Sequence, residues 1–335
     1  MSSCLVTGGA GFMGSHVARS LVAFGHDLVV LDDLSGGFVD NVPNGAEFVK
    51  GSAVDFELLE GLFEKHRFEY VFHLAAYAAE GLSHHIRRFN YENNVVASAG
   101  LISLAIRYAV KRFVFTSSIA VYGEAELPMR ENMPMRPIDP YGIAKMAVEM
   151  DLDSAQRYFG LDYTIFRPHN VYGENQNTAD RYRNVVGIFM NQIMNSEPMT
   201  IFGNGTQTRA FSYIGDVAPV IAQSVGIPES ANEVFNIGAD QPHSVLKLAN
   251  VVAQAFATEP EIEFLPERHE VLHAYSSHEK LREVFGETES TTLEMGIGAM
   301  ADWAKEVGPR TSALFSSIEV RKSLPPSWDT EADHK

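Results

Sequence analysis

Residues 4–14 read Cys4-Leu5-Val6-Thr7-Gly8-Gly9-Ala10-Gly11-Phe12-Met13-Gly14, a short apolar run that leads directly into a glycine-spaced turn. Gly8, Gly11 and Gly14 lie three residues apart. That spacing permits a tight turn, a close approach of the backbone to phosphate oxygens, and close packing of the next helix on the strand. The free N–H groups at the start of that helix would hold a pyrophosphate. A glycine-rich turn can also be a turn without a ligand, so the neighbouring residues must show which of the two interpretations holds.

The residues that follow this turn favour a dinucleotide site. Residues 15–22 have the apolar spacing of a helix, Gly25 can end it, and residues 28–31 predict a second buried strand. Asp32 and Asp33 stand at the end of that strand. A carboxylate there accepts hydrogen bonds from both adenosine ribose hydroxyls and repels a 2′-phosphate, so we predict NAD rather than NADP. In the alternative interpretation, Asp32 only begins a turn.

Strand-like runs recur at residues 70–74, 112–116 and 163–167, with helical patterns around 93–109 and 141–159. This alternation predicts an α/β fold, a Rossmann-type doubly wound parallel sheet with helices on both faces. Ligands bind at the carboxyl ends of the strands in such sheets. The polar residues that follow the three runs are therefore expected to converge on one cleft.

The pattern loosens after Gly173, which predicts a second, smaller unit. We assign residues 1–173 to an NAD-binding domain, with segments of about 208–258 packing back onto it, and 174–320 mainly to a substrate-binding subdomain. Residues 321–335 are polar and proline-bearing, which predicts a poorly ordered tail.

Composition narrows the function classes. The 335 residues are 45% hydrophobic, which suffices for a large core, and they carry a formal net charge of -17, which argues against nucleic acid as a partner. No apolar stretch predicts a membrane span and no signal peptide is evident, so we expect a cytoplasmic protein. Cys4 is the only cysteine. It excludes an internal disulfide, and we predict no metal site.

Tyr141 and Lys145 are spaced i, i+4, which places both side chains on one face of a helix that Pro140 can begin. The ammonium can then stabilise a phenolate. We expect Lys145 and a positively charged nicotinamide to lower the pKa of Tyr141 from about 10 toward neutrality. Ser118, at a strand end, can hold a substrate alcohol and pass its proton to Tyr141. Without Ser118, Tyr141 and Lys145 could simply be two exposed residues on one face of a helix.

These motifs together resemble the extended short-chain dehydrogenases/reductases, and most closely the NAD-dependent nucleotide-sugar epimerases and dehydratases. The resemblance extends to about residue 310 in family order and spacing. It is carried by Thr7 to Gly14, Asp32, His73-Leu74-Ala75-Ala76, Asn93, Ser118 with Val121-Tyr122-Gly123, and Tyr141 to Lys145.

The resemblance also implies binding residues. For the cofactor these are Gly8, Gly11, Phe12, Met13, Gly14, Asp32, Asp33, Ser35, Ser52, Ala53, Leu74, Ala75, Ala76, Asn93, Ser117, Tyr141, Lys145 and Pro168. For a UDP-sugar they are Ser118, Asn170, Thr178, Arg181, Asn184, Val185, Arg209, Arg268 and Tyr275. Arg209 and Arg268 resemble two arginines that clamp the diphosphate, although either could instead form a surface ion pair.

The family members differ beside the catalytic hydroxyl. Dehydratases carry Asp-Glu there, whereas Ser118 is followed by Ile119 and Ala120. The resemblance therefore implies a 4-epimerase of the UDP-galactose epimerase type, which oxidises and re-reduces C4 through a transient 4-keto sugar. A dehydratase with its base elsewhere, and a non-catalytic NAD-sensing protein, remain as alternatives.

The substrate is less closely defined by the sequence. Tyr275 lies near the position that filters N-acetyl sugars, and a bulky ring there favours UDP-glucose and UDP-galactose. Arg181 and Arg183 could bind the carboxylate of UDP-glucuronate, or they could be solvated loop charges. Glu80 adds a charge without an assigned role. The family pattern also implies a homodimer through the helices near 93–109 and 141–159.

Overall fold

A seven-stranded parallel sheet forms the centre of the computed structural model, which describes residues 2–180, 182–267, 271–287, 290–309, 315, 318–325 and 328. The strand order is β3-β2-β1-β4-β5-β6-β11. The order reverses beside β1, which follows the doubly wound plan, so the predicted fold class is confirmed. The crevice at the carboxyl ends of β1 and β4 is therefore the expected ligand position.

The strands and helices have the following bounds. The strands are β1 Ser3–Thr7, β2 Asp27–Asp32, β3 Ala46–Lys50, β4 Tyr70–His73, β5 Arg112–Thr116, β6 Tyr163–Pro168, β7 Val171–Tyr172, β8 Met199–Phe202, β9 Thr208–Ala210, β10 Ser212–Tyr213, β11 Glu233–Ile237, β12 Pro242–Ser244, β13 Ile262–Leu265 and β14 His273–Ala274. The α-helices are α1 Phe12–Ala23, α2 Phe56–His66, α3 Glu80–Ser83, α4 Arg87–Tyr91, α5 Ala97–Arg107, α6 Pro140–Phe159, α7 Val185–Met194, α8 Ile214–Gln223, α9 Val245–Ala255, α10 Glu279–Phe285 and α11 Leu293–Val307. A π-helical turn, Glu92–Val96, joins α4 to α5, and 3-10 turns lie at Val39–Asn41, Ile119–Tyr122, Ser224–Gly226 and Pro228–Ser230.

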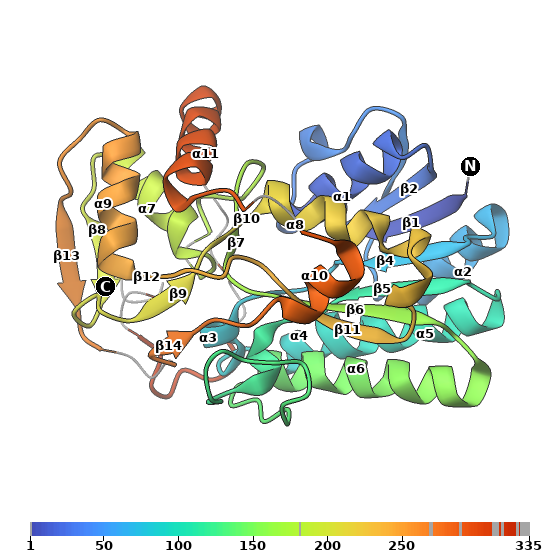
Figure 1. Cartoon of the computed structure of the whole chain (residues 1–335). Helices are drawn as coiled ribbons and strands as arrows, with labels where there is room; N and C mark the ends of the chain where they lie inside the picture. The colour runs from blue at the N-terminus through green and yellow to red at the C-terminus, as the bar shows by residue number, and fades with distance from the viewer. Residues whose placement is uncertain are drawn as a thin grey trace.

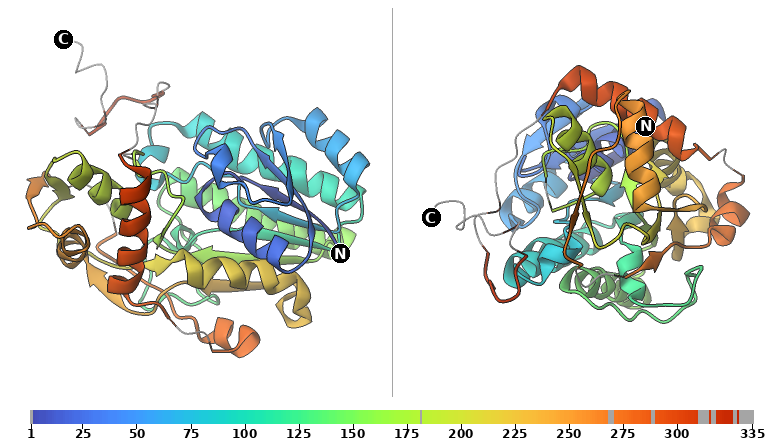
Figure 2. Two further views of the ribbon diagram at one scale, coloured as in Figure 1. Left: turned by 90° about the horizontal axis from the view of Figure 1, so that it is seen from above. Right: turned by 90° about the vertical axis from the view of Figure 1, so that its left-hand side faces the viewer.

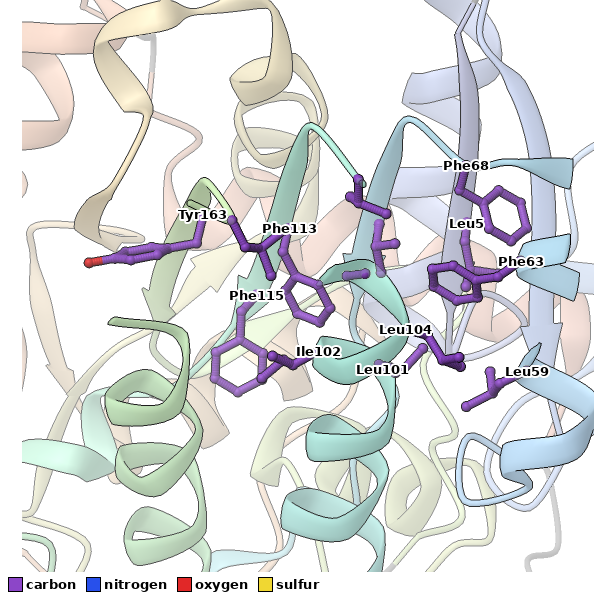
Figure 3. Close-up of a cluster of buried hydrophobic side chains, with 14 of the residues drawn as sticks. Leu5, Leu59, Phe63, Phe68, Leu101, Ile102, Leu104, Phe113, Phe115 and Tyr163 are labelled. Carbon is purple, nitrogen blue, oxygen red and sulfur yellow. The ribbon is translucent and has the colours of Figure 1, made fainter. Parts of the chain in front are cut away.

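Alternating apolar residues on the strands give the sheet two buried faces. Leu5 of β1 packs with α2, α5 and α6, whereas its neighbour Val6 packs with α1 and α8. Figure 3 shows the first face, where Phe63 of α2 and Leu104 of α5 lie under the strands. On the other face, α1 and α8 lie side by side (Figures 1 and 2). Successive side chains of a strand point to opposite faces of the sheet. Apolar residues at consecutive positions are therefore buried on both faces, as a parallel sheet covered by helices on both sides requires.

A separate apolar cluster holds the smaller part of the molecule, where α7, α9 and α11 pack together with β8 (Figure 1). Within the segment of about 208–258, α8 and β11 pack on the sheet, whereas α9 packs with α7 and α11. The chain therefore crosses between the two parts more than once. The division at residues 173 and 174, with segments of about 208–258 packing back onto the first domain, stays a prediction.

Trp328 lies in the segment 321–335, for which the sequence predicts a poorly ordered tail, and its side chain is buried. Its indole is 6% exposed and packs with Leu82 and Ile86 beside α3. A side chain at Gly81 would lie 3.1 Å from the ring, so the contact is close. Among the described residues, no helix is both long and apolar enough to cross a bilayer.

Candidate active site

The glycine turn between β1 and α1 has the geometry of a phosphate-binding turn. Gly8 has φ +71°, and a Cβ at Gly14 would lie 2.1 Å from the Gly8 carbonyl oxygen. A side chain at Gly14 would therefore push α1 away from the strand. No side chain caps the helix at Gly11. The first N–H groups of α1 are thus suited to a pyrophosphate, and the predicted NAD cradle fits the backbone.

Asp32 ends β2 beside this turn. Its Oδ2 accepts hydrogen bonds from the N–H groups of Ala10 (3.0 Å) and Gly11 (3.2 Å), and its Oδ1 accepts one from Leu34 (2.8 Å). Burial raises the pKa of Asp32, while these backbone bonds oppose the rise. The remaining lone pairs are suited to ribose hydroxyls. Asp32 therefore also fixes the glycine turn.

The other predicted cofactor residues surround this strand-end crevice. Ser35 is exposed in the loop after β2, whereas Ser52 and Ala53, which follow β3, are half-buried. The Ala75 N–H donates to Thr7 Oγ1 (3.3 Å), which ties the ends of β4 and β1 together. A Cβ at Gly8 would lie 2.7 Å from the Ala75 nitrogen and 3.1 Å from the Leu74 carbonyl carbon, so these two residues border the turn, and Ala76 follows them in the chain. Leu74, Phe12 and Met13 pack against the same apolar cluster.

Ser118, Tyr141 and Lys145 meet at the end of β5. Ser118 caps the 3-10 turn after β5, and Asp139 caps α6 by accepting a hydrogen bond from the Gly142 N–H (2.9 Å). This cap places Tyr141 in the first turn, close enough to Ser118 for that hydroxyl to lower the pKa of the phenol against the larger effect of burial. Lys145 Nζ lies 5.7 Å from the Tyr141 ring centroid and donates to the Thr116 carbonyl oxygen (2.7 Å). The three predicted catalytic residues therefore lie together.

We predicted that the pKa of Tyr141 is lowered. As far as the protein's own residues determine this pKa, the prediction is wrong. Burial raises the pKa of Tyr141, and the hydrogen bond from Ser118 opposes this only in part. Glu80 and Asp139 raise it further because of their negative charge. Burial also lowers the pKa of Lys145 to about 7. Both groups are desolvated together, and this outweighs the attraction that the i, i+4 spacing suggests.

A buried ion pair lies beneath these residues. Arg167 of β6 donates to both carboxylate oxygens of Glu149, from Nε (3.0 Å) and Nη2 (2.5 Å), and each side chain is 4% exposed. Ser117 Oγ also donates to Glu149, so the hydroxyl proton of Ser117 is already used within the protein. Glu149 is two turns along α6 from Tyr141, and its charge raises the pKa of Lys145 against the effect of burial. It therefore favours the ammonium form.

A cleft opens in front of Ser118. The predicted residues Pro168, Asn170 and Arg209 line it together with Ser118, and so does Glu80 from the start of α3. Arg209 Nη2 donates to the Val271 carbonyl oxygen (2.6 Å), which holds the guanidinium against the cleft wall. The cleft thus contains both the Ser118 hydroxyl and an arginine, a residue type suited to binding a diphosphate.

The remaining predicted substrate residues lie on other segments. Asn184 Oδ1 caps α7 by accepting from the Val186 N–H (3.0 Å), and Val185 begins that helix. Thr178 is buried, and Tyr275, half-buried, accepts a hydrogen bond at its carbonyl oxygen from the Met129 N–H (3.0 Å). Arg181 and Arg268 fall outside the described residues.

Asn94 is a site residue that the sequence analysis missed. Its Oδ1 accepts from the Tyr77 N–H (3.0 Å) and its Nδ2 donates to Asn90 Oδ1 (2.8 Å), which fixes the loop after β4. The predicted Asn93 donates instead to the Phe89 carbonyl oxygen (2.9 Å) on its own helix. A π-helical turn contains both asparagines. Such turns are frequent at functional sites, but nothing in the sequence marks this one.

A Rossmann-type sheet with a glycine turn and a Ser-Tyr-Lys set at its strand ends defines an enzyme of the short-chain dehydrogenase/reductase class. Residues 4–238 match the model of the NAD dependent epimerase/dehydratase family, and the chain belongs to that family. The cofactor of this enzyme is NAD, as predicted.

Individual relatives cover nearly the whole chain. UDP-glucose 4-epimerase of Mycolicibacterium smegmatis is 34% identical over 307 residues, which are 89% of this chain and 97% of that protein. UDP-glucose 4-epimerase of Thermotoga maritima, solved with UDP-glucose, is 35% identical with a TM-score of 0.87, covering 91% of this chain and 99% of that one. UDP-glucose 4-epimerase of Thermus thermophilus, solved with NAD, is 30% identical with a TM-score of 0.85, and the match covers 90% of this chain and 99% of that one. This similarity identifies the chain as an isomerase.

Proposed function

We propose that this enzyme is a 4-epimerase that interconverts UDP-glucose and UDP-galactose. The observation that carries the proposal is that Ser118 and Tyr141 meet at the end of β5, where the Ser118 hydroxyl opposes the rise in the Tyr141 pKa and Lys145 lies beside the phenol ring. Where the dehydratase pattern places two acids, Ile119 and Ala120 supply no proton-transfer group. Proton transfer at an alcohol, without proton abstraction from carbon, is what this set supports.

Each catalytic residue has one role in this proposal. Ser118 holds the sugar 4-hydroxyl and passes its proton to Tyr141, which returns it after the sugar has turned over. The Lys145 ammonium stabilises the phenolate that forms when Tyr141 acts as base. NAD supplies the hydride acceptor and donor when bound. No net oxidation results, so the cofactor is expected to stay with the protein.

Two charges favour a neutral hexose over a uronic acid. Glu80 lines the cleft with Ser118, and its carboxylate would repel a carboxylate at C6 of the sugar. Arg183, which could have bound that carboxylate, pairs with Asp180 (3.0 Å) and lies 4.6 Å from the Tyr77 ring centroid. We therefore place UDP-glucuronate second.

A panel of sugar nucleotides tests the proposal. Purified protein is incubated with UDP-glucose, UDP-galactose, UDP-N-acetylglucosamine or UDP-glucuronate, and the sugars are followed by proton NMR. We expect the first two to interconvert without accumulation of NADH. Conversion of UDP-glucuronate alone would overturn the substrate assignment, and loss of water would show a dehydratase. No turnover of any sugar, with NAD bound, would support a sensing role instead.

We also propose a homodimer through α5 and α6. The supporting observation is a set of exposed apolar side chains on these helices and the turn before them: Val96 is 58% exposed, Met150 59%, Tyr158 83% and Phe159 61%. Exposed apolar side chains on two helices that pack against each other are typical of a protein–protein interface. Light scattering after gel filtration should give twice the mass of one chain, and a single-chain mass would contradict the proposal. A cytoplasmic location stays a prediction.

A further inference from the structure

A segment late in the chain packs on the two short helices beside the cleft. We use the name clasp for its described residues, which are Phe315, residues 318–325 and Trp328. The clasp lies beside α3 and α4, and its apolar side chains form one cluster with those of the two helices (Figure 2, right). The family match covers residues 4–238, so the clasp lies outside it. The role of the clasp therefore has to follow from its own contacts.

Trp328 anchors the clasp by packing. Its buried indole contacts Leu82 of α3 and Ile86, the residue before α4. A Cβ at Gly81 would lie 3.1 Å from the indole, so a side chain there would press on the ring. The ring of Tyr182 meets the indole edge-on, with 5.6 Å between the ring centroids. A buried aromatic ring of this size contributes much of the energy of such a contact, so Trp328 is the residue to test.

Hydrogen bonds join the clasp to the chain between α3 and α4. The His85 carbonyl oxygen accepts from the N–H groups of Glu319 (2.9 Å) and Val320 (3.1 Å), and His85 Nδ1 donates to the Val320 carbonyl oxygen (2.7 Å). The Glu319 carboxylate accepts from the N–H groups of Arg88 (2.8 Å) and Phe89 (2.9 Å). These N–H groups belong to the first turn of α4 and have no partner inside that helix. The clasp therefore caps α4 from a distant part of the chain.

The two helices that the clasp holds contact the first turn of α6. Ser83 Oγ accepts from the Tyr141 N–H (3.3 Å), and Asn90 Nδ2 donates to the Pro140 carbonyl oxygen (2.9 Å). Glu80 begins α3 and lines the cleft. Its negative charge raises the pKa of Tyr141. A shift of α3 would therefore move both a backbone partner of Tyr141 and a carboxylate of the cleft.

We propose that Trp328 is a positioning residue, which holds α3 and α4 against α6 through the clasp and thereby fixes Tyr141 for proton transfer. The Tyr141 hydroxyl must stay within hydrogen-bond reach of its partners, and a displacement of about 1 Å can lower a rate by about 10²-fold. Packing on the outer side of α3 can therefore set the rate without contact to the substrate. The inference rests on the proposed function, because it takes Tyr141 as the acid and base.

Turnover of UDP-galactose by full-length, NAD-loaded proteins tests this role. Trp328→Ala should lower kcat about tenfold or more, because α3 and the first turn of α6 lose their support. Its KM should change less than about threefold, because the substrate candidates Asn170 and Arg209 lie on other segments, after β6 and on β9. Trp328→Phe keeps an aromatic ring in the apolar cluster and should retain kcat within about threefold of the parent's value.

Trp303→Ala is the matched control, since the chain has two tryptophans. Trp303 is half-buried on α11, where it packs on the apolar cluster of α7 and α9. Its removal should lower the thermal midpoint, as Trp328→Ala also does, but should leave kcat unchanged. The comparison thus separates a loss of stability from a loss of positioning.

Hydrogen exchange provides a readout that needs no turnover. Mass spectrometry of peptides from the NAD-loaded proteins should show faster exchange of residues 80–91 and 139–145 in Trp328→Ala than in the parent. Exchange in α9 should be the same in both. Glu319→Ala detaches the clasp from α4 without emptying a packed position, and it should change kcat and exchange in the same direction. It decides the question if Trp328→Ala does not fold.

The outcomes distinguish the clasp from the proposed function. Equal kcat in Trp328→Ala and the parent, or equal losses in Trp328→Ala and Trp303→Ala, would overturn the role of the clasp and leave the proposed function intact. If the parent turns over none of the sugar nucleotides, the proposed function is contradicted and hydrogen exchange alone decides on the clasp. Faster exchange around Tyr141 would then support its role, and unchanged exchange would overturn it.

Discussion

Replacing Tyr141 with phenylalanine is expected to lower kcat by about 10³-fold, the usual contribution of a positioned acid or base, while NAD stays bound. The phenyl ring keeps the packing of the first turn of α6, where Tyr141 is 8% exposed. What is lost is the hydroxyl whose pKa Ser118 helps to lower. The variant should therefore differ from the parent in turnover and not in stability.

The matched control for this variant lies on the same helix. Tyr158→Phe also removes one hydroxyl from α6, but its side chain is 83% exposed. It should keep full activity. Turnover of UDP-galactose, bound NAD measured by absorbance after denaturation, and the thermal midpoint are measured for both. Activity of Tyr141→Phe above about one tenth of the parent's would show that another group is the base.

Glu149→Gln should lower the free energy of unfolding by about 3–5 kcal/mol, because it leaves the Arg167 guanidinium buried without a counter-charge. Both side chains are 4% exposed, so water cannot replace the lost partner. Urea titration at a fixed NAD concentration measures the change. The same substitution removes the negative charge that raises the pKa of Lys145. The Lys145 pKa should then fall below its value of about 7. When the pH is raised, the variant should therefore lose the ammonium form, and with it its activity, at a lower pH than the parent does.

A second variant keeps this prediction testable if Glu149→Gln is too unstable to purify. The double variant Glu149→Gln, Arg167→Met removes both charges, and it should be less destabilised than the sum of the single changes. Glu279→Gln is the exposed control, since it breaks only the surface pair with Arg130 (2.5 Å). It should leave the urea midpoint unchanged. Equal losses at the buried and exposed pairs would contradict the account of the buried pair.

The sequence predicts the parts of this fold that depend on neighbours in the chain. The turn after β1, the acid at the end of β2 and the Tyr-Lys pair on α6 all follow from local spacing. The parallel sheet follows from the alternation of strands and helices. Contacts between distant segments leave no such pattern, and β11 joins the sheet beside β6 after a long excursion through the smaller part.

The electrostatics of the site depend on burial, which the sequence does not show. Tyr141 and Lys145 are desolvated together, so the pKa of the tyrosine rises instead of falling. The Glu149–Arg167 pair joins α6 to β6, and the His169–His278 pair is 109 residues apart in the chain. Each of these residues alone is compatible with a surface position. Only the tertiary packing buries these polar groups, so that each of them needs a partner within the protein.

The central claim is that Ser118, Tyr141 and Lys145 drive a hydride exchange at C4 with no proton removed from carbon. Epimerisation of UDP-glucose in D₂O, followed by proton NMR of the sugar ring, tests this directly. The account predicts UDP-galactose with full proton signals at C4 and C5, because the hydride leaves and returns without meeting solvent. Deuterium at C5, or a deoxy sugar formed by loss of water, would contradict it.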